Sequence, residues 1–469
     1  MTVKQEAIAA KVKEEPIVGY LPADTPPWGA MLSLGFQQVL TMFPATVLVA
    51  ILTKFDVGVT LLASGLGTIV ALLVSSRRIP MYYGSSFSYI TVVITAMSLY
   101  AKDCFASSAV YCPEGVRLVQ VGIIGTAVVE ILVGLLIMRI GKDALDKVLP
   151  PVITGSVAIV IGIALAGAAL GEAAANWPVA FITLIVTIAF SVYLQGKGLL
   201  GMLPILLGAV VGYIVAIPFG LLKDAPSIIG AAQWVRVPAI TFPAFGDPRA
   251  WAVVVSISLI AIATIPESTA HLYQMSLYID ALAKELKKAP VEIKKLIGLN
   301  LVADGSDDII VGLLGGCAGT NYGENNSLMA ITRNYSVPVL MTAGVMAIVL
   351  GFIGKLAALV NTIPVPVIGG LSIYLFGVIG MQGIALIQSE KVNLFEPRQL
   401  AVGATVLIAG IGGALALKDG LFPFSIPVIF PNGIPAIVFA AIVGILLNLL
   451  FLLLPPSLFG VKERENINL

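Results

Sequence analysis

Long apolar segments, separated by proline, glycine and charged residues, run through almost the whole chain. A helix that crosses a bilayer needs about 20 predominantly apolar residues, and the pattern predicts fourteen such spans. They lie at residues 29–53, 57–76, 84–100, 117–139, 150–171, 178–194, 200–221, 250–272, 294–312, 324–336, 338–360, 365–388, 398–416 and 433–455. Spans 3 and 10 are short, and we expect them to be discontinuous helices.

The composition agrees with this pattern. Of the 469 residues, 58% are hydrophobic and 11% are charged, so lipid rather than water must solvate most of the chain. The sequence therefore predicts an all-α polytopic membrane protein. The net charge of +1 and the lack of a basic patch interleaved with aromatic residues exclude nucleic acid as a partner. The polar N-terminal segment, residues 1–28, has no signal-peptide pattern.

Lysine and arginine predict the orientation, because cytoplasmic loops carry an excess of them. With the N-terminus inside, 19 of the 27 basic residues fall on the cytoplasmic side. We therefore expect the protein in the plasma membrane, with both termini, including the tail at 456–469, on the cytoplasmic side.

Three short matches relate the two halves of the chain. YGSS at residues 83–86 is similar to YGEN at 322–325, PVITG at 151–155 to PVIGG at 366–370, and the segment 204–212 to 435–444. These matches pair spans 3, 5 and 7 with spans 10, 12 and 14. An offset of seven spans reverses the direction of threading, so the sequence predicts a 7+7 inverted repeat.

The stretch GLLGGCAGTNYGENNSLMAITR at 312–333 is unusual for a membrane helix, because glycine, asparagine and a glutamate interrupt it. Non-helical backbone at membrane depth is tolerated where it is buried in protein or lines a cavity, and an ionisable residue there indicates function. In inverted repeats the substrate lies between broken helices whose N-terminal N–H groups point at it. The alternative is a kinked structural pair with polar caps. The candidate binding residues at these helix starts are Ser86, Phe87, Tyr322, Gly323, Glu324 and Asn325.

Span 8 contains Glu267 and His271, which lie four residues apart and so share one helix face. Pro266 is expected to loosen the helix just before Glu267. Glu267 is a candidate substrate ligand and proton carrier, whereas His271 either assists it or satisfies a neighbouring group. No second histidine exists, so we expect no zinc site, and no cofactor fingerprint is present.

Span 9 contains Asp304, Asp307 and Asp308 without an adjacent basic residue. They either order the neighbouring spans by hydrogen bonding or bind a coupling cation. The sequence favours a structural role for Asp307 and Asp308 and leaves the role of Asp304 open. Cys104 and Cys112 share a polar segment, where they form either a disulfide on the outer face or two free thiols.

Taken together, these residues resemble the nucleobase/ascorbate transporter family, and most closely its bacterial uracil permeases. The resemblance runs from about residue 27 to 454 and includes SLGFQQVLTMFPATVLV, IPMYYGSSFSYI, the Glu-x-x-x-His of span 8 and NYGENNSLMAITR. The last is similar to the family signature, with Glu324, Asn325 and Thr332 at matching positions. Ser327 replaces the signature glycine, and Gln38 stands where uracil permeases often have histidine.

The resemblance implies two domains and a homodimer. Spans 1–4 and 8–11, at 29–140 and 250–360, would form a core domain that binds substrate. Spans 5–7 and 12–14, at 150–221 and 365–455, would form a gate domain. It also implies two short antiparallel strands that lead into half-helices 3 and 10.

The resemblance further assigns roles at the site. It makes Glu267 and Glu324 the substrate-binding carboxylates, places the backbone of Phe87 and Gly323 against the base, and puts His271 beside them. Uracil has two ring N–H donors and two carbonyl acceptors, which carboxyl groups and backbone N–H groups complement.

We therefore expect import of uracil by proton symport, with Glu267, His271, Asp304 and Gln38 as candidates for proton handling. A dehydrated carboxyl favours its protonated form, so a neutral substrate could cross with one proton. The alternatives are a xanthine or other purine carrier, sodium coupling, an anion transporter of the same fold, a sensor, and an intramembrane enzyme. Two carboxylates oppose an anion site, and no catalytic constellation supports an enzyme.

Overall fold

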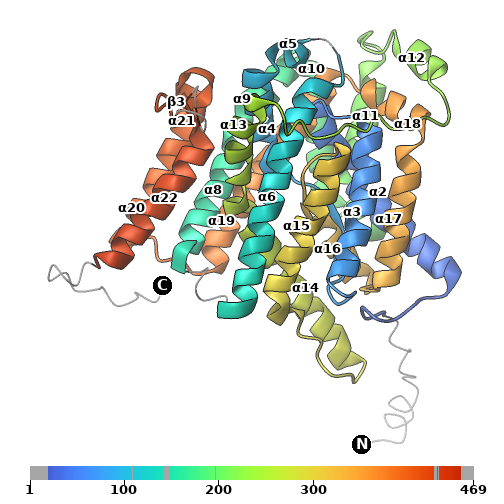
Figure 1. Cartoon of the computed structure of the whole chain (residues 1–469). Helices are drawn as coiled ribbons and strands as arrows, with labels where there is room; N and C mark the ends of the chain where they lie inside the picture. Colours follow the sequence, from blue (N-terminus) through green and yellow to red (C-terminus); the bar gives the residue numbers. More distant parts are fainter. Residues whose placement is uncertain are drawn as a thin grey trace, which may run out of the picture.

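The computed structural model describes residues 19–455 apart from 108, 142–146, 196, 427–429 and 431–432. Most of the predicted N-terminal segment and the predicted tail at 456–469 thus lie outside the described residues. Figure 1 shows a bundle of helices with a few very short strands.

The described helices overlap every one of the predicted spans. The longer helices are α2 (Trp28–Leu52), α3 (Val57–Val74), α4 (Ile90–Tyr100), α6 (Pro113–Ile140), α8 (Pro151–Ala164), α9 (Ala166–Ala174), α10 (Trp177–Tyr193), α11 (Pro204–Ala216), α13 (Pro248–Ser258), α14 (Ala261–Glu285), α15 (Ile297–Leu314), α16 (Gly323–Thr332), α17 (Val337–Gly351), α19 (Val365–Ser389), α20 (Pro397–Leu407) and α22 (Ala436–Leu453). The shorter helices are η1 (Phe87–Tyr89), α5 (Lys102–Ala106), η2 (Gly198–Met202), α12 (Ala225–Ala231), η3 (Ile293–Leu296), α18 (Gly354–Asn361), the π-helical turn η4 (Ile408–Gly412), α21 (Gly413–Ala416) and η5 (Lys418–Gly420).

The structure confirms an all-helical protein that crosses a membrane several times. In the described part of the chain, seven helices are long and apolar enough to span a bilayer, or eight if the bent pair α13–α14 counts as one. Four further apolar segments are shorter: η1 with α4, α10, α11 and α17.

Span 8 differs from the prediction in the position of its break. The chain bends by 43° between α13 and α14, whereas Pro266 lies inside α14. A proline clashes with the carbonyl group four residues earlier, so it disturbs the helix on its N-terminal side. The bend lies at Leu259 and Ile260, where Ile260 donates to the carbonyl of Ile257 in a tightened i−3 bond.

The helices pack in two groups. In one group, α6 packs on α13 and α15, and α3 packs on α15 and α17. In the other, α8 packs on α19, α10 on α11 and α19, and α20 on α22. Figure 1 shows α20 and α22 at the edge of the bundle, far from α2 and α17. Contacts of α14 with α8 and of α16 with η2 join the two groups.

Two short strands lead directly into the half-helices. β1 (Tyr83–Ser85) and β2 (Gly319–Asn321) pair antiparallel, with Gly84 opposite Thr320. This confirms the strands that were expected before η1 and α16. A second pair, β3 (Leu421–Phe422) and β4 (Ile434–Pro435), precedes α22.

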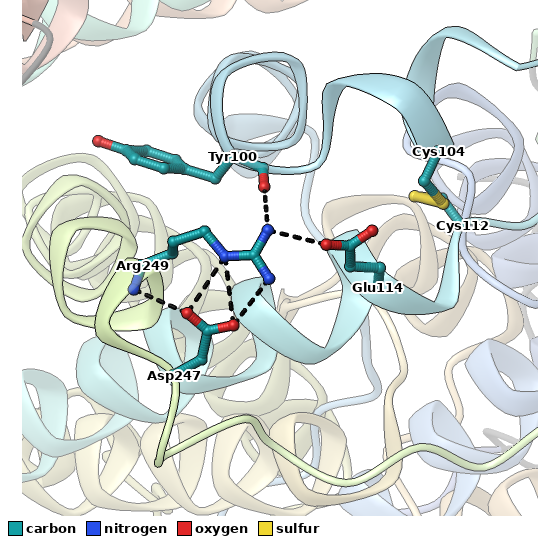
Figure 2. Close-up of polar contacts among 6 residues, drawn as sticks. All are labelled: Tyr100, Cys104, Cys112, Glu114, Asp247 and Arg249. Carbon is teal, nitrogen blue, oxygen red and sulfur yellow. Dashed lines mark hydrogen bonds and ion pairs between the residues drawn. A yellow bond between two sulfur atoms is a disulfide. The ribbon is translucent and has the colours of Figure 1, made fainter.

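A polar cluster at the α5 end of the bundle contains the expected disulfide (Figure 2). The structure joins Cys104 and Cys112. Beside them, Arg249 pairs with Asp247 and Glu114, each at 2.8 Å, and also donates to the carbonyl of Tyr100. Hydrogen bonds from Arg249 lower the pKa of Asp247 below its usual value, so this ion pair is present at neutral pH. The disulfide and Arg249 together attach the α4–α5 segment to α6 and α13.

Candidate functional site

The two half-helices start at opposite ends of the β1–β2 ladder. Ser86 donates its N–H to the carbonyl of Ala318, and Tyr322 donates to the carbonyl of Tyr82, which extends the ladder by one bond at each end. The Ser86 hydroxyl then accepts a hydrogen bond from the N–H of Ser88 and so caps η1. Because the strands are antiparallel, η1 and α16 leave the ladder in opposite directions.

Glu267 lies at the first of these helix starts. Its Oε2 accepts a hydrogen bond from the Ser88 hydroxyl at 3.2 Å. Its side chain also interacts electrostatically with His271 and Glu324. Glu267 is half-buried and Glu324, in the first turn of α16, is exposed. The two carboxyl groups therefore lie within electrostatic range of each other.

His271 connects α14 to β2. Its Nδ1 lies 2.9 Å from the backbone carbonyl oxygen of Asn321 and 2.8 Å from the Oδ1 atom. A carbonyl oxygen can only accept, so Nδ1 carries a proton and donates to Asn321. Asn321 is oriented in turn by Ser268, whose hydroxyl oxygen accepts from Asn321 at 2.8 Å and from Asn300 at 2.7 Å.

The Nε2 side of this ring faces the start of α16. A Cβ atom on Gly323 would lie 2.9 Å from Nε2 of His271. The absence of a side chain at Gly323 therefore lets the imidazole approach the helix terminus closely. Glu267, His271 and the N-terminal turn of α16 are thus brought together, as the sequence predicted.

Four other candidates connect neighbouring elements around the site: Gln38, Asn325, Tyr322 and Phe87. The Asn325 amide donates to Oε1 of Gln38 at 2.7 Å and to its carbonyl oxygen at 3.0 Å, which joins α16 to α2. The Tyr322 hydroxyl donates to the carbonyl of Ser85 and contacts the Thr46 hydroxyl. Phe87 packs its partly buried ring on the main hydrophobic core.

The aspartates of α15 lie behind the strands. Asp308 accepts the N–H of Gly319 at 2.6 Å and the hydroxyl of Tyr89 at 2.8 Å, so it joins α15 to β2 and η1. Asp304 accepts from the Thr320 hydroxyl at 3.4 Å, and neither oxygen of Asp307 has a hydrogen-bond partner within the described residues. Across the same residues, no group of three or more His, Cys, Asp or Glu side chains could hold a metal ion.

Sequence reasoning missed several residues of this region. Ser88, Ser268 and Asn300 orient Glu267 and Asn321, but serine and asparagine are too common in such proteins to stand out. Glu130 on α6 is different, because it is the single acidic residue of the predicted span 117–139. An ionisable residue at membrane depth is itself a signal.

The chain is similar to known permeases over most of its length. A family model described as "Permease family" matches residues 29–418. The uracil permease of Bacillus caldolyticus is 36% identical over 438 residues, which cover 91% of this chain and 93% of that protein. The uracil permease of Escherichia coli K12 is 33% identical and covers 84% of this chain and 87% of that protein.

Solved structures of anion transporters share the fold at low sequence identity. The transmembrane domain of a cyanobacterial bicarbonate transporter superimposes with a TM-score of 0.53 at 15% identity, covering 90% of this chain and 97% of that one. The murine solute carrier 26 family member A9, in its inward-facing state, gives 0.62 at 12% identity, covering 96% and 75%.

Proposed function

The chain belongs to the xanthine/uracil permease family, and on this premise we propose that it is a secondary active transporter that imports uracil. A transporter of this family is not an enzyme. The sequence resemblance is therefore confirmed at the level of the family. Substrate, coupling ion and mechanism are the proposal.

One observation carries the proposal: Glu267 and His271, on one face of α14, lie between the starts of two half-helices. Glu267 is held by Ser88 at the start of η1, and His271 lies against Gly323 at the start of α16. Carboxyl groups accept hydrogen bonds from the ring N–H groups of a pyrimidine, and N–H groups at a helix start donate hydrogen bonds to its carbonyl oxygens. The names of the relatives, which are uracil permeases, support a pyrimidine over a purine.

The chain would form fourteen spans in a 7+7 inverted repeat. The helix group around α3, α6 and α15 corresponds to the core domain, 29–140 and 250–360, and the group around α8, α10 and α19 to the gate domain, 150–221 and 365–455. Alternating access would move the core against the gate, so the contacts of α14 with α8 and of α16 with η2 would rearrange during transport. Both termini would be cytoplasmic in the bacterial plasma membrane, and the transporter would be a homodimer.

Proton symport follows from the carboxyl groups at the site. Glu267 has a hydroxyl donor and no cationic partner among its described hydrogen bonds, so it can exchange a proton as the site opens and closes. A neutral base that crosses with one proton moves a positive charge, which a negative interior potential favours. Sodium is the alternative. It is disfavoured at Asp308, whose oxygens already accept protein N–H and O–H groups.

Uptake into proteoliposomes tests the proposal. Purified protein is reconstituted with an inward proton gradient and given radiolabelled uracil, with unlabelled uracil, xanthine, guanine and sulfate as competitors. We expect unlabelled uracil to compete most strongly. In buffer without sodium, we expect a protonophore to abolish the accumulation of radiolabelled uracil. Stronger competition by xanthine or guanine would identify a purine carrier, and competition by sulfate an anion transporter. Uptake that requires external sodium and survives the protonophore would replace proton coupling with sodium coupling.

A further inference from the structure

Glu130 is a buried carboxyl group that the proposed substrate site does not use. Its side chain on α6 is 1% exposed. Oε1 accepts a hydrogen bond from the Thr264 hydroxyl at 2.5 Å, and Oε2 has no partner among the described residues. Burying a polar atom without a hydrogen-bond partner costs free energy, so the position of Glu130 calls for an explanation.

Acidic and phenolic groups of three neighbouring elements lie within electrostatic range of Glu130. The carboxyl groups of Asp304, Asp307 and Asp308 on α15 interact with it electrostatically. Tyr83 on β1 and Tyr89 on η1 also interact with it. None of these groups is basic, so no salt bridge within the described part of the chain explains the position of Glu130.

The hydrogen-bond partner of Glu130, Thr264, lies next to the bend of span 8. Thr264 is in the first turn of α14, just after the bend that separates α13 from α14, and three residues before Glu267. One turn earlier on the same face of α6, Thr126 donates to the carbonyl of Ile257, just before the bend. Helix α6 therefore holds span 8 on both sides of its break.

We propose that Glu130 is a positioning residue for Glu267. By accepting the Thr264 hydroxyl, it fixes the first turn of α14 relative to α6, and this fixes the direction in which Glu267 extends toward Ser88 and the substrate. Thr264 and Glu267 belong to the same helix, since α14 continues without a break through Pro266, so rotation of the turn at Thr264 would rotate Glu267 with it. The inference rests on the proposed function, because it assigns Glu267 to the substrate.

A double-mutant cycle tests the contact itself without any substrate. Glu130→Leu, Thr264→Val and the double variant are compared with the parent by thermal unfolding in detergent. If the two side chains act together, the double variant loses less stability than the sum of the two single losses. Strictly additive losses would overturn the contact.

Uracil binding tests the positioning role. We expect Glu130→Leu and Thr264→Val each to raise the Kd for uracil about tenfold, as the loss of one buried hydrogen bond can do. Glu130→Gln keeps an oxygen acceptor and should stay within about threefold of the parent. Thr187→Val is the matched control, because this buried hydroxyl donates to the carbonyl of Thr183 within its own helix α10, and its Kd should not change.

Two results would overturn the positioning role. One is an unchanged Kd in Glu130→Leu with a lowered unfolding temperature, which would leave only a structural role. The other is an equal loss in Glu130→Gln and Glu130→Leu, because the retained oxygen acceptor would then be irrelevant. If the parent protein itself binds no uracil, the proposed function fails instead, and the unfolding cycle still reports on the contact.

Discussion

Nε2 of His271 lies 2.9 Å from the position that a Cβ atom on Gly323 would occupy. The imidazole cannot retreat freely, because its Nδ1 donates to the carbonyl of Asn321 on the adjacent strand. Helix α14 and the start of α16 are therefore in contact at a point where even a methyl group does not fit.

Gly323→Ala should weaken uracil binding by moving His271 or the first turn of α16. Overpacking of this kind costs about 1 to 3 kcal/mol, and at the site it should appear as a raised Kd, measured by calorimetry. Gly377→Ala on α19 is the control, since no atom lies within 4 Å of its Cβ position. Equal affinities in the two variants would contradict the packing of His271 against α16.

Ser268→Ala should destabilise the protein and weaken binding together. The Ser268 hydroxyl oxygen accepts from both Asn300 and Asn321, so its removal leaves two buried amide donors without that partner. Each unsatisfied donor costs about 1 to 3 kcal/mol. Thermal unfolding and Kd are measured on Ser268→Ala and on the surface control Ser227→Ala, and unchanged values for both would refute this network.

Glu267→Ala should remove detectable uracil binding. A ring N–H of the substrate would lose its acceptor, and the Ser88 hydroxyl would lose its partner as well. Glu390→Ala, at an exposed carboxylate that follows α19, should bind as the parent does. Tight binding by the Glu267 variant would mean that the substrate lies elsewhere.

Glu324→Gln should alter which base is preferred. An amide at this position both donates and accepts, whereas a carboxylate only accepts, so uracil should bind more weakly and a purine could gain affinity. Competition by uracil, xanthine and guanine in the uptake assay measures the change. The assignment of Glu324 fails if the order of the three competitors stays the same.

Cys104 and Cys112 should be oxidised in protein purified without reductant. After denaturation, alkylation and mass measurement, we expect one modified thiol, that of the buried Cys317, from three cysteines. Replacing both partners by serine should lower the unfolding temperature, because the bond restricts the unfolded chain. Three alkylated thiols would show that the disulfide does not form.

The sequence by itself determined the membrane class, the approximate positions of the helices and the two half-helix starts. These features depend on local composition, because a run of about 20 apolar residues or an interruption by glycine and asparagine has the same meaning wherever the chain folds. Spacing alone also placed Glu267 and His271 on one helix face, and short matches between the halves located the partner of span 3.

Only the tertiary structure decided which side chains meet. The bend of span 8 lies at Leu259 and Ile260 rather than next to Pro266, and His271 donates to Asn321, 50 positions away in the chain. Glu130 reaches Thr264 across 134 positions. Hydrogen bonds between distant helices depend on the rotation and height of each helix in the bundle, and packing against neighbouring helices sets both quantities.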